Sequence, residues 1–160
     1  MTHRALLLGA AYGTLLHVPR SLDRLEAALG RHGFTGVERR LDLGAEALLA
    51  AIDRLIDVAA PGDPVALVYV GHGGRRDDFG YLLPEPGRSV VIGLELGDRL
   101  ARLSEKTGNL TVVLDCCHAS GLVEDAAHLT DVQLRELVTR RRAVVRGDGL
   151  AGAVQLLAAA

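Results

Sequence analysis

The apolar runs of this chain are short, and each of them ends at a polar or glycine-rich turn. Residues 5–9, 64–70 and 111–114 are aliphatic or β-branched at nearly every position. Strands that are buried on both faces of a parallel sheet need this composition, so we predict three central strands. A further run at 34–41 carries three consecutive charged residues, which indicate a strand near the edge of the sheet. We expect a last strand at 151–158.

Helical periodicity of apolar residues fills the segments between these runs. The predicted helices are 21–30, 45–59, 93–104 and 130–141. Ser21 has the side chain of an N-cap for the first of them. The glycines at 71–74 indicate a loop, and 81–84 is typical of a hairpin arm. Strands and helices alternate, so we predict an α/β fold, a three-layer α/β/α sandwich with a mostly parallel sheet, in one domain over residues 1–160.

Composition narrows the class of protein. The chain has 160 residues, of which 49% are hydrophobic and 24% are charged, with a net charge of −2. Only 3% of the residues are aromatic, and this scarcity together with the net charge argues against nucleic-acid binding. No apolar run is long enough for a membrane span and no signal peptide is evident. The two cysteines are adjacent and suit a reducing compartment, so we expect a cytoplasmic protein.

Two of the predicted central strands end abruptly in residues that can do chemistry. The run at 64–70 is followed by Gly71, His72 and two further glycines, and the run at 111–114 by Asp115, Cys116, Cys117 and His118. His72 and Cys117 are 45 positions apart, which leaves room for a helical crossover between parallel strands. An imidazole at one strand end can then reach a thiol at the next and make it a thiolate. This pattern predicts the dyad of a cysteine protease.

The motifs YVGHG and LDCCHASG resemble those of the caspase and metacaspase peptidases, which share the caspase-haemoglobinase fold. The spacing agrees with a histidine about 50 residues before the caspase cysteine. The resemblance implies a caspase-like catalytic domain of the large-subunit type, in which 122–150 corresponds to the processing linker. It implies that 151–160 begins the first strand of the small subunit, and that a further segment or a partner chain completes the sheet and the groove for a peptide substrate.

The resemblance also assigns roles at the strand ends. Side chains alternate along a strand, so one thiol faces the cleft and the other the sheet. The family places the nucleophile second, which makes Cys117 the nucleophile, His72 its base, and Cys116 a small buried residue. Backbone N–H groups of Gly73 and Cys117 would form the oxyanion hole. His118 is expected to be structural.

Specificity is implied by Asp115. The matching acid of metacaspases lines the primary specificity pocket and pairs with Arg or Lys of the substrate, whereas caspases have Gln there and prefer Asp. A carboxylate attracts a basic side chain, so we expect cleavage after Arg or Lys. The family's Asn-Asp pair before the first helix aligns with Arg20 and Ser21, and a positive charge at Arg20 would weaken that preference.

We expect no metal or other cofactor. A zinc site built from Cys116, Cys117, His118 and His72 lacks the usual spacer between the cysteines. The acids after the nucleophile, Glu124, Asp125 and Asp131, do not have the spacing of the calcium site of metacaspases. Two functions remain open: a cysteine endopeptidase that cuts after a basic residue, and a catalytically silent module that binds partners or assembles. Self-processing would cut after one of Arg140, Arg141, Arg142 or Arg146.

Overall fold

A computed structural model of the chain describes residues 1–76, 79–86, 90–117 and 154–158. Within these residues the main sheet has five strands in the order β2-β1-β3-β7-β8, and every neighbouring pair is parallel. The strands are β1 (Arg4–Gly9), β2 (Gly36–Leu41), β3 (Val65–Val70), β7 (Leu110–Asp115) and β8 (Val154–Ala158). The central runs, the charged strand at the edge and the last strand therefore form as the hydrophobic pattern predicts.

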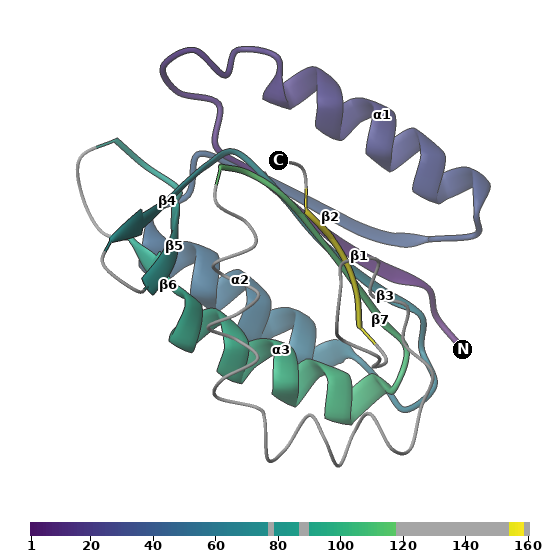
Figure 1. The fold of residues 1–160 in the computed structure, drawn as a ribbon. Coiled ribbons are helices and arrows are strands. Elements are labelled where there is room, and N and C mark those ends of the chain that lie inside the picture. The colour runs from purple at the N-terminus through teal and green to yellow at the C-terminus, as the bar shows by residue number, and fades with distance from the viewer. Residues whose placement is uncertain (77–78, 87–89, 118–153, 159–160) are drawn as a thin grey trace.

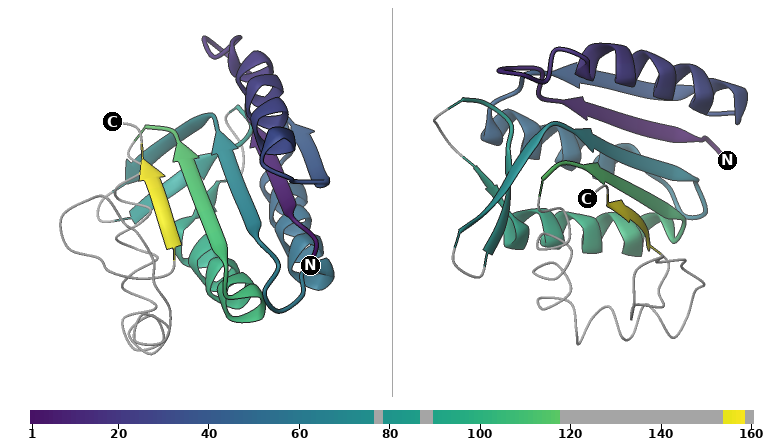
Figure 2. Two further views of the ribbon diagram at one scale, coloured as in Figure 1. Left: turned by 90° about the vertical axis from the view of Figure 1, so that its right-hand side faces the viewer. Right: turned by 45° about the horizontal axis from the view of Figure 1, so that its top comes forward.

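In the described part of the chain, three helices cover the two faces of this sheet. They are α1 (Val18–Arg31), α2 (Ala45–Val58) and α3 (Gly93–Thr107). Helix α1 lies over one face, and α2 and α3 lie side by side over the other (Figure 1; the tilted views of Figure 2 show the same layers). The predicted three-layer α/β/α sandwich with a mostly parallel sheet is confirmed.

The core divides into two layers because side chains alternate along each strand. Leu6, Leu67 and Val112 belong to the layer that packs against α2 and α3. Leu7 and Val68 point to the other face and pack with Val18 and Leu22 of α1. All of these side chains are at most 3% exposed. An aliphatic strand residue therefore finds a partner on either face, which explains the uninterrupted apolar runs.

A second, smaller sheet follows the end of β3. Its antiparallel strands are β4 (His72–Arg76), β5 (Phe79–Leu83) and β6 (Val91–Ile92), in that order. The hairpin arm predicted at 81–84 overlaps β5. The glycines at 71–74, however, were expected to form a loop, and the expectation was wrong for residues 72–74. Pairing with β5 supplies backbone partners for a sequence that has little strand propensity of its own.

Two helix ends differ from the prediction. Helix α1 begins at Val18 with His17 as N-cap, so Ser21 lies inside the helix and is not its cap. Pro19 explains the earlier start, because a proline fits the first helical turn, where its missing N–H needs no partner. Helix α3 continues to Thr107 and ends at Gly108, whose φ of 68° is the left-handed conformation that favours glycine.

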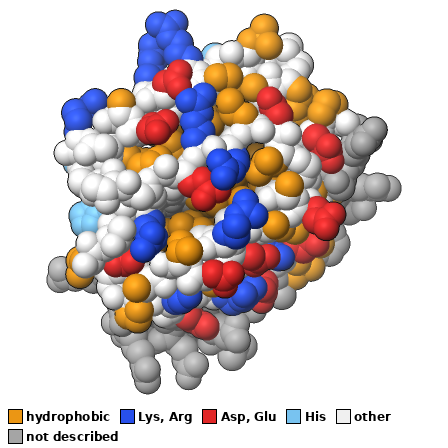
Figure 3. Space-filling model, turned by 180° about the vertical axis from the view of Figure 1, so that it is seen from behind, with side chains coloured by type: hydrophobic (Ala, Val, Ile, Leu, Met, Phe, Trp, Pro, Cys, Tyr) orange, Lys and Arg blue, Asp and Glu red, His pale blue; other side chains and the backbone are white. Residues whose placement is uncertain are grey.

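The predicted helix at 130–141 and most of the linker-like segment 122–150 lie outside the described residues. No helix of the described part is both long and apolar enough to span a bilayer. Figure 3 shows that basic and acidic side chains are interspersed on the face seen from behind, with apolar side chains between them. The described residues on that face therefore form no large area of a single charge.

Candidate active site

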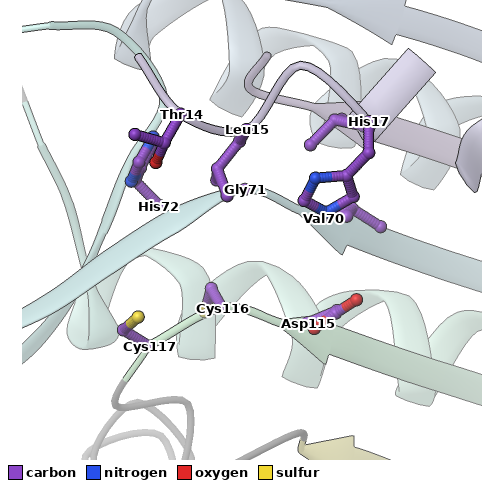
Figure 4. A pocket seen from close by; sticks show the side chains of 10 residues that line it. Thr14, Leu15, His17, Val70, Gly71, His72, Asp115, Cys116 and Cys117 are labelled. Carbon is purple, nitrogen blue, oxygen red and sulfur yellow. The ribbon is translucent and has the colours of Figure 1, made fainter. Parts of the chain in front are cut away.

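The strand order places a pocket at the carboxyl end of the main sheet. The chain leaves β1 on the α1 side of the sheet and leaves β2 through α2 on the other side, so the strand order reverses at β1. Sites in open α/β sheets form at such a reversal, where the connections diverge. The pocket here has a volume of about 310 Å³. It is lined by Thr14, Leu15, His17, Val18, Val70, Gly71, His72, Asp115, Cys116 and Cys117 (Figure 4).

The register of β3 and β7 brings the predicted dyad to this pocket. Val70 of β3 pairs with Asp115 of β7, and the Gly71 N–H donates to the Asp115 carbonyl oxygen at 3.0 Å. His72 and Cys117 each follow this pair by two positions. Two residues along a strand return a side chain to the same face, so both side chains start on the α1 side of adjacent strand ends.

The two strand ends approach so closely that only glycine fits at position 73. A Cβ atom on Gly73 would lie 2.5 Å from the Cys117 carbonyl oxygen and 3.0 Å from the Cys116 sulfur. These separations are well inside van der Waals contact. The missing side chain of Gly73 therefore lets the backbone after His72 pack directly on the backbone of the two cysteines.

The two thiols have different surroundings. Cys116 is 6% exposed and belongs to the core layer under α2 and α3. Burial, with smaller contributions from the charges of Cys117 and Asp115, raises the pKa of the Cys116 thiol to about 12. Cys117 is exposed, and its sulfur projects into the pocket region (Figure 4). A buried thiol of such high pKa is a poor nucleophile, so the exposed Cys117 is the better candidate nucleophile of the two.

The imidazole of His72 is held by Tyr12, which lies in the loop between β1 and α1. Nε2 of His72 is 3.0 Å from the Tyr12 carbonyl oxygen. A carbonyl oxygen only accepts, so Nε2 carries the proton and Nδ1 of the neutral ring is left as the basic nitrogen. The two rings also stack, with their centroids 4.3 Å apart and their planes inclined by 32°.

Of the three predicted specificity residues, one lines the pocket and two do not. Asp115 is exposed at the end of β7 and lines the pocket, and no ion pair joins it to another described residue. Arg20 and Ser21 lie in the first two turns of α1 and are not among the lining residues. Other residues named from the sequence lie outside the described residues: His118, Glu124, Asp125, Asp131, Arg140, Arg141, Arg142 and Arg146.

Sequence reasoning missed the residues that the loop after β1 contributes. Thr14 and His17 line the pocket, and Figure 4 shows the His17 ring above β3, on the side of the pocket opposite Asp115. His17 is exposed, and as N-cap of α1 it makes no capping hydrogen bond through its side chain. The loop at 10–17 has no periodicity, so no local signal marks these residues. The only sequence signal for these residues was that a Thr and a His occur in a loop after a buried strand.

Metal-binding groups do not gather at this site within the described residues. No three side chains of His, Cys, Asp or Glu in that part of the chain are placed so as to hold one metal ion. The arrangement of an imidazole and an exposed thiol at one pocket is suited to acyl transfer, which needs a nucleophile and a base.

The fold and the pocket define an α/β protein with a histidine and a cysteine at adjacent strand ends. The sequence matches the family model of the caspase domain over residues 2–151, which is nearly the whole chain, and the protein belongs to that family. No curated protein matches the sequence. Among solved structures, the crystal structure of protein GSU0716 from Geobacter sulfurreducens is similar with a TM-score of 0.63 and 16% identity, covering 99% of this chain and 72% of that one. At this identity the similarity concerns the fold alone.

Proposed function

We propose that this protein is a cysteine endopeptidase in which His72 activates Cys117. The observation that carries the proposal is the register of β3 and β7, which brings both residues to one pocket at equivalent positions beyond a paired Val70 and Asp115. Membership of the caspase-domain family supports a peptidase in general. The strand register and the shared pocket lining support the particular pair.

The mechanism follows from the atoms available. Nδ1 of His72 takes the proton of the Cys117 thiol, and the thiolate attacks the scissile carbonyl carbon. The backbone N–H groups of Gly73 and Cys117 stabilise the resulting oxyanion. The protonated imidazole then gives its proton to the leaving amine, and a thioester remains on Cys117. Water, deprotonated by the same imidazole, attacks the thioester and releases the acid and the free thiol.

We further propose cleavage after Arg or Lys. The exposed carboxylate of Asp115 lies on the wall of the pocket beside the nucleophile and has no ion-pair partner among the described residues. A guanidinium offers two parallel N–H donors to such a carboxylate. Arg20, which could have weakened this preference, does not line the pocket. An acidic side chain would meet repulsion from Asp115 instead.

A covalent label tests the enzyme against the catalytically silent module. The full chain is incubated with a peptide chloromethyl ketone that ends in arginine, and the adduct is located by mass spectrometry. We expect one adduct per chain, lost in Cys117→Ala and in His72→Ala and kept in the control Cys116→Ala. Absence of any adduct, together with no cleavage of arginine or lysine peptides, would favour the interaction module.

Specificity is tested by competing electrophiles that end in arginine, lysine or aspartate. We expect the parent to prefer the basic probes and Asp115→Asn to lose roughly 1–3 kcal/mol of that preference, because charge-assisted hydrogen bonds contribute about this much. Arg20→Ala is the matched control and should leave the preference unchanged. Equal labelling by basic and acidic probes in the parent contradicts the role of Asp115.

Self-processing is part of the same proposal. The segment between Cys117 and β8 contains Arg140, Arg141, Arg142 and Arg146, each of which has the side chain that Asp115 would select. We expect breaks after one or more of these residues in the purified parent and none in Cys117→Ala, as mass spectrometry of the intact protein can show. Breaks that persist in Cys117→Ala indicate a contaminating protease.

A further inference from the structure

All three tyrosines of the chain lie at the strand pair that begins with His72. Tyr12 stacks on the His72 ring, Tyr69 reaches the His72 backbone, and Tyr81 lies against Gly74 across the β4–β5 pair. The chain has only three tyrosines and no tryptophan. Large, polar-tipped side chains are thus used at one place in a protein whose core is otherwise aliphatic.

Tyr12 connects the His72 ring to the second sheet. Its ring packs on the imidazole, and its hydroxyl donates to the carbonyl oxygen of Leu83 at 2.8 Å. Leu83 is the last residue of β5 and is the pairing partner of His72 in β4. Burial raises the pKa of the Tyr12 hydroxyl, so the hydroxyl stays a donor across the working range of pH. The ring is therefore fixed at both ends, by its backbone and by its hydroxyl.

Tyr69 contacts the backbone of His72 from within the core of the main sheet. It is the fifth residue of β3 and is 1% exposed. Its single hydroxyl proton is shared between the His72 carbonyl oxygen at 2.9 Å and the Leu83 carbonyl oxygen at 3.3 Å. A Cβ atom on Gly71 would lie 2.8 Å from this hydroxyl, so the glycine makes the approach possible. Burial raises the Tyr69 pKa strongly, which keeps this hydroxyl protonated as well.

We propose that Tyr12 and Tyr69 are positioning residues for His72. Tyr12 sets the plane of the imidazole, and Tyr69 sets the backbone from which the imidazole extends. Both hydroxyls lie within hydrogen-bond distance of the Leu83 carbonyl oxygen. The same contacts therefore hold the β4–β5 strand pair on the main sheet and orient the imidazole of His72. This inference rests on the proposed function, because it matters only where His72 acts on Cys117.

The test measures alkylation of Cys117 by iodoacetamide in the full chain, at pH 7 and at pH 9.5. At the lower pH the rate depends on the base that ionises the thiol. At the higher pH a thiol of ordinary pKa, about 8.5, is ionised without help. The variants are Tyr12→Leu, Tyr12→Phe and Tyr69→Phe, with Tyr81→Phe as the control that removes a tyrosine hydroxyl from the same strand pair. His72→Ala gives the rate without the base.

We expect Tyr12→Leu and Tyr69→Phe to lower the rate at pH 7 by at least about tenfold, because misplacement by 1 Å can cost about a hundredfold. The rate at pH 9.5 should be unchanged. Tyr12→Phe keeps the stacked ring and should recover part of the loss that Tyr12→Leu shows. Tyr81→Phe should match the parent at both pH values.

Three results would overturn the inference, and they differ in what else they overturn. Parental rates at pH 7 in Tyr12→Leu and Tyr69→Phe, when His72→Ala is slow, reject the positioning role and leave the dyad intact. Equal losses at both pH values in these variants show a structural role only. A parental rate in His72→Ala rejects the dyad itself, and the inference falls with it. If Tyr69→Phe does not fold, the two variants of the partly buried Tyr12 decide the question.

Discussion

Replacing Gly73 by alanine should damage both the stability of the protein and the reactivity of Cys117. The added Cβ would lie 2.5 Å from the Cys117 carbonyl oxygen, about 1 Å short of an ordinary contact of ~3.5 Å. The nearest atoms belong to backbone and to the buried Cys116, and neither can rotate away. The two strand ends must therefore separate by a substantial part of that shortfall.

The size of the effect follows from this separation. Overpacking of a filled site costs about 1–3 kcal/mol of the free energy of unfolding. A displacement approaching 1 Å between His72 and Cys117 can slow a reaction that needs both by about a hundredfold. The first quantity is measured by urea denaturation, and the second by the rate at which iodoacetamide alkylates Cys117 at neutral pH.

Gly30→Ala is the matched control. Gly30 lies in α1, and a Cβ atom there would meet no atom within 4 Å. Alanine in a helix is more stable than glycine by about 0.5–1 kcal/mol, so this variant should be slightly more stable than the parent, with unchanged alkylation of Cys117. A Gly73→Ala variant that is as stable and as reactive as the parent would refute the close packing of the strand ends.

Three further outcomes are expected. Iodoacetamide at pH 7.5 should alkylate Cys117 faster than Cys116 by orders of magnitude. The reason is that a thiol with a pKa of about 12 is ionised in roughly three parts in 10⁵ at that pH. Equal alkylation rates of the two cysteines in peptide mapping would contradict this. The N–H of Thr2 donates to Asp63 and is the main cause of the lowered pKa of that carboxyl. The carboxylate of Asp63 therefore stabilises the fold above about pH 4, and this contribution is lost as the pH falls through the lowered pKa. In urea denaturation, Asp63→Asn should lose less stability between pH 5 and pH 3 than the parent does. The Lys106 ammonium donates to two carbonyl oxygens in the last turn of α2. Lys106→Met should therefore lower the free energy of unfolding by about 1 kcal/mol in urea denaturation. An unchanged denaturation midpoint would show that these hydrogen bonds do not stabilise the end of the helix.

The central strands were predictable because burial on both faces leaves a local trace. In a parallel sheet between helices, Leu6 and Leu7 face opposite layers and both must be apolar. The edge strand was predictable for the opposite reason, since only one side of β2 is paired and its sequence is charged. These features depend on short stretches of sequence, and a single chain suffices to find them.

Features that depend on distant partners were not predictable. Strand β4 is rich in glycine and forms through its pairing with β5. The start of α1 was assigned to Ser21 on side-chain chemistry, whereas the fixed φ of Pro19 suits the first turn of a helix that begins at Val18.

The candidate site shows the same division between local and distant signals. His72 and Cys117 were found because each follows the abrupt end of an apolar run. Tyr12 was not found, because its hydrogen bond with His72 joins residues that are 60 positions apart. His17 was overlooked for a similar reason, as it reaches the pocket only when the loop after β1 folds over the end of β3.

The charged edge strand β2 makes the two edges of the main sheet unequal in their capacity to pair with a further strand. Arg39 of β2 pairs with Asp23 of α1, and Glu38 pairs with Arg40 and with Arg54 of α2. Charges along an edge strand oppose the addition of another strand, because docking a neighbour would strip water from them. The described sheet ends at β8 on its other side. A strand from elsewhere in the polypeptide, or from a second molecule, would therefore extend the sheet beside β8, at the end nearer the strand that carries Cys117.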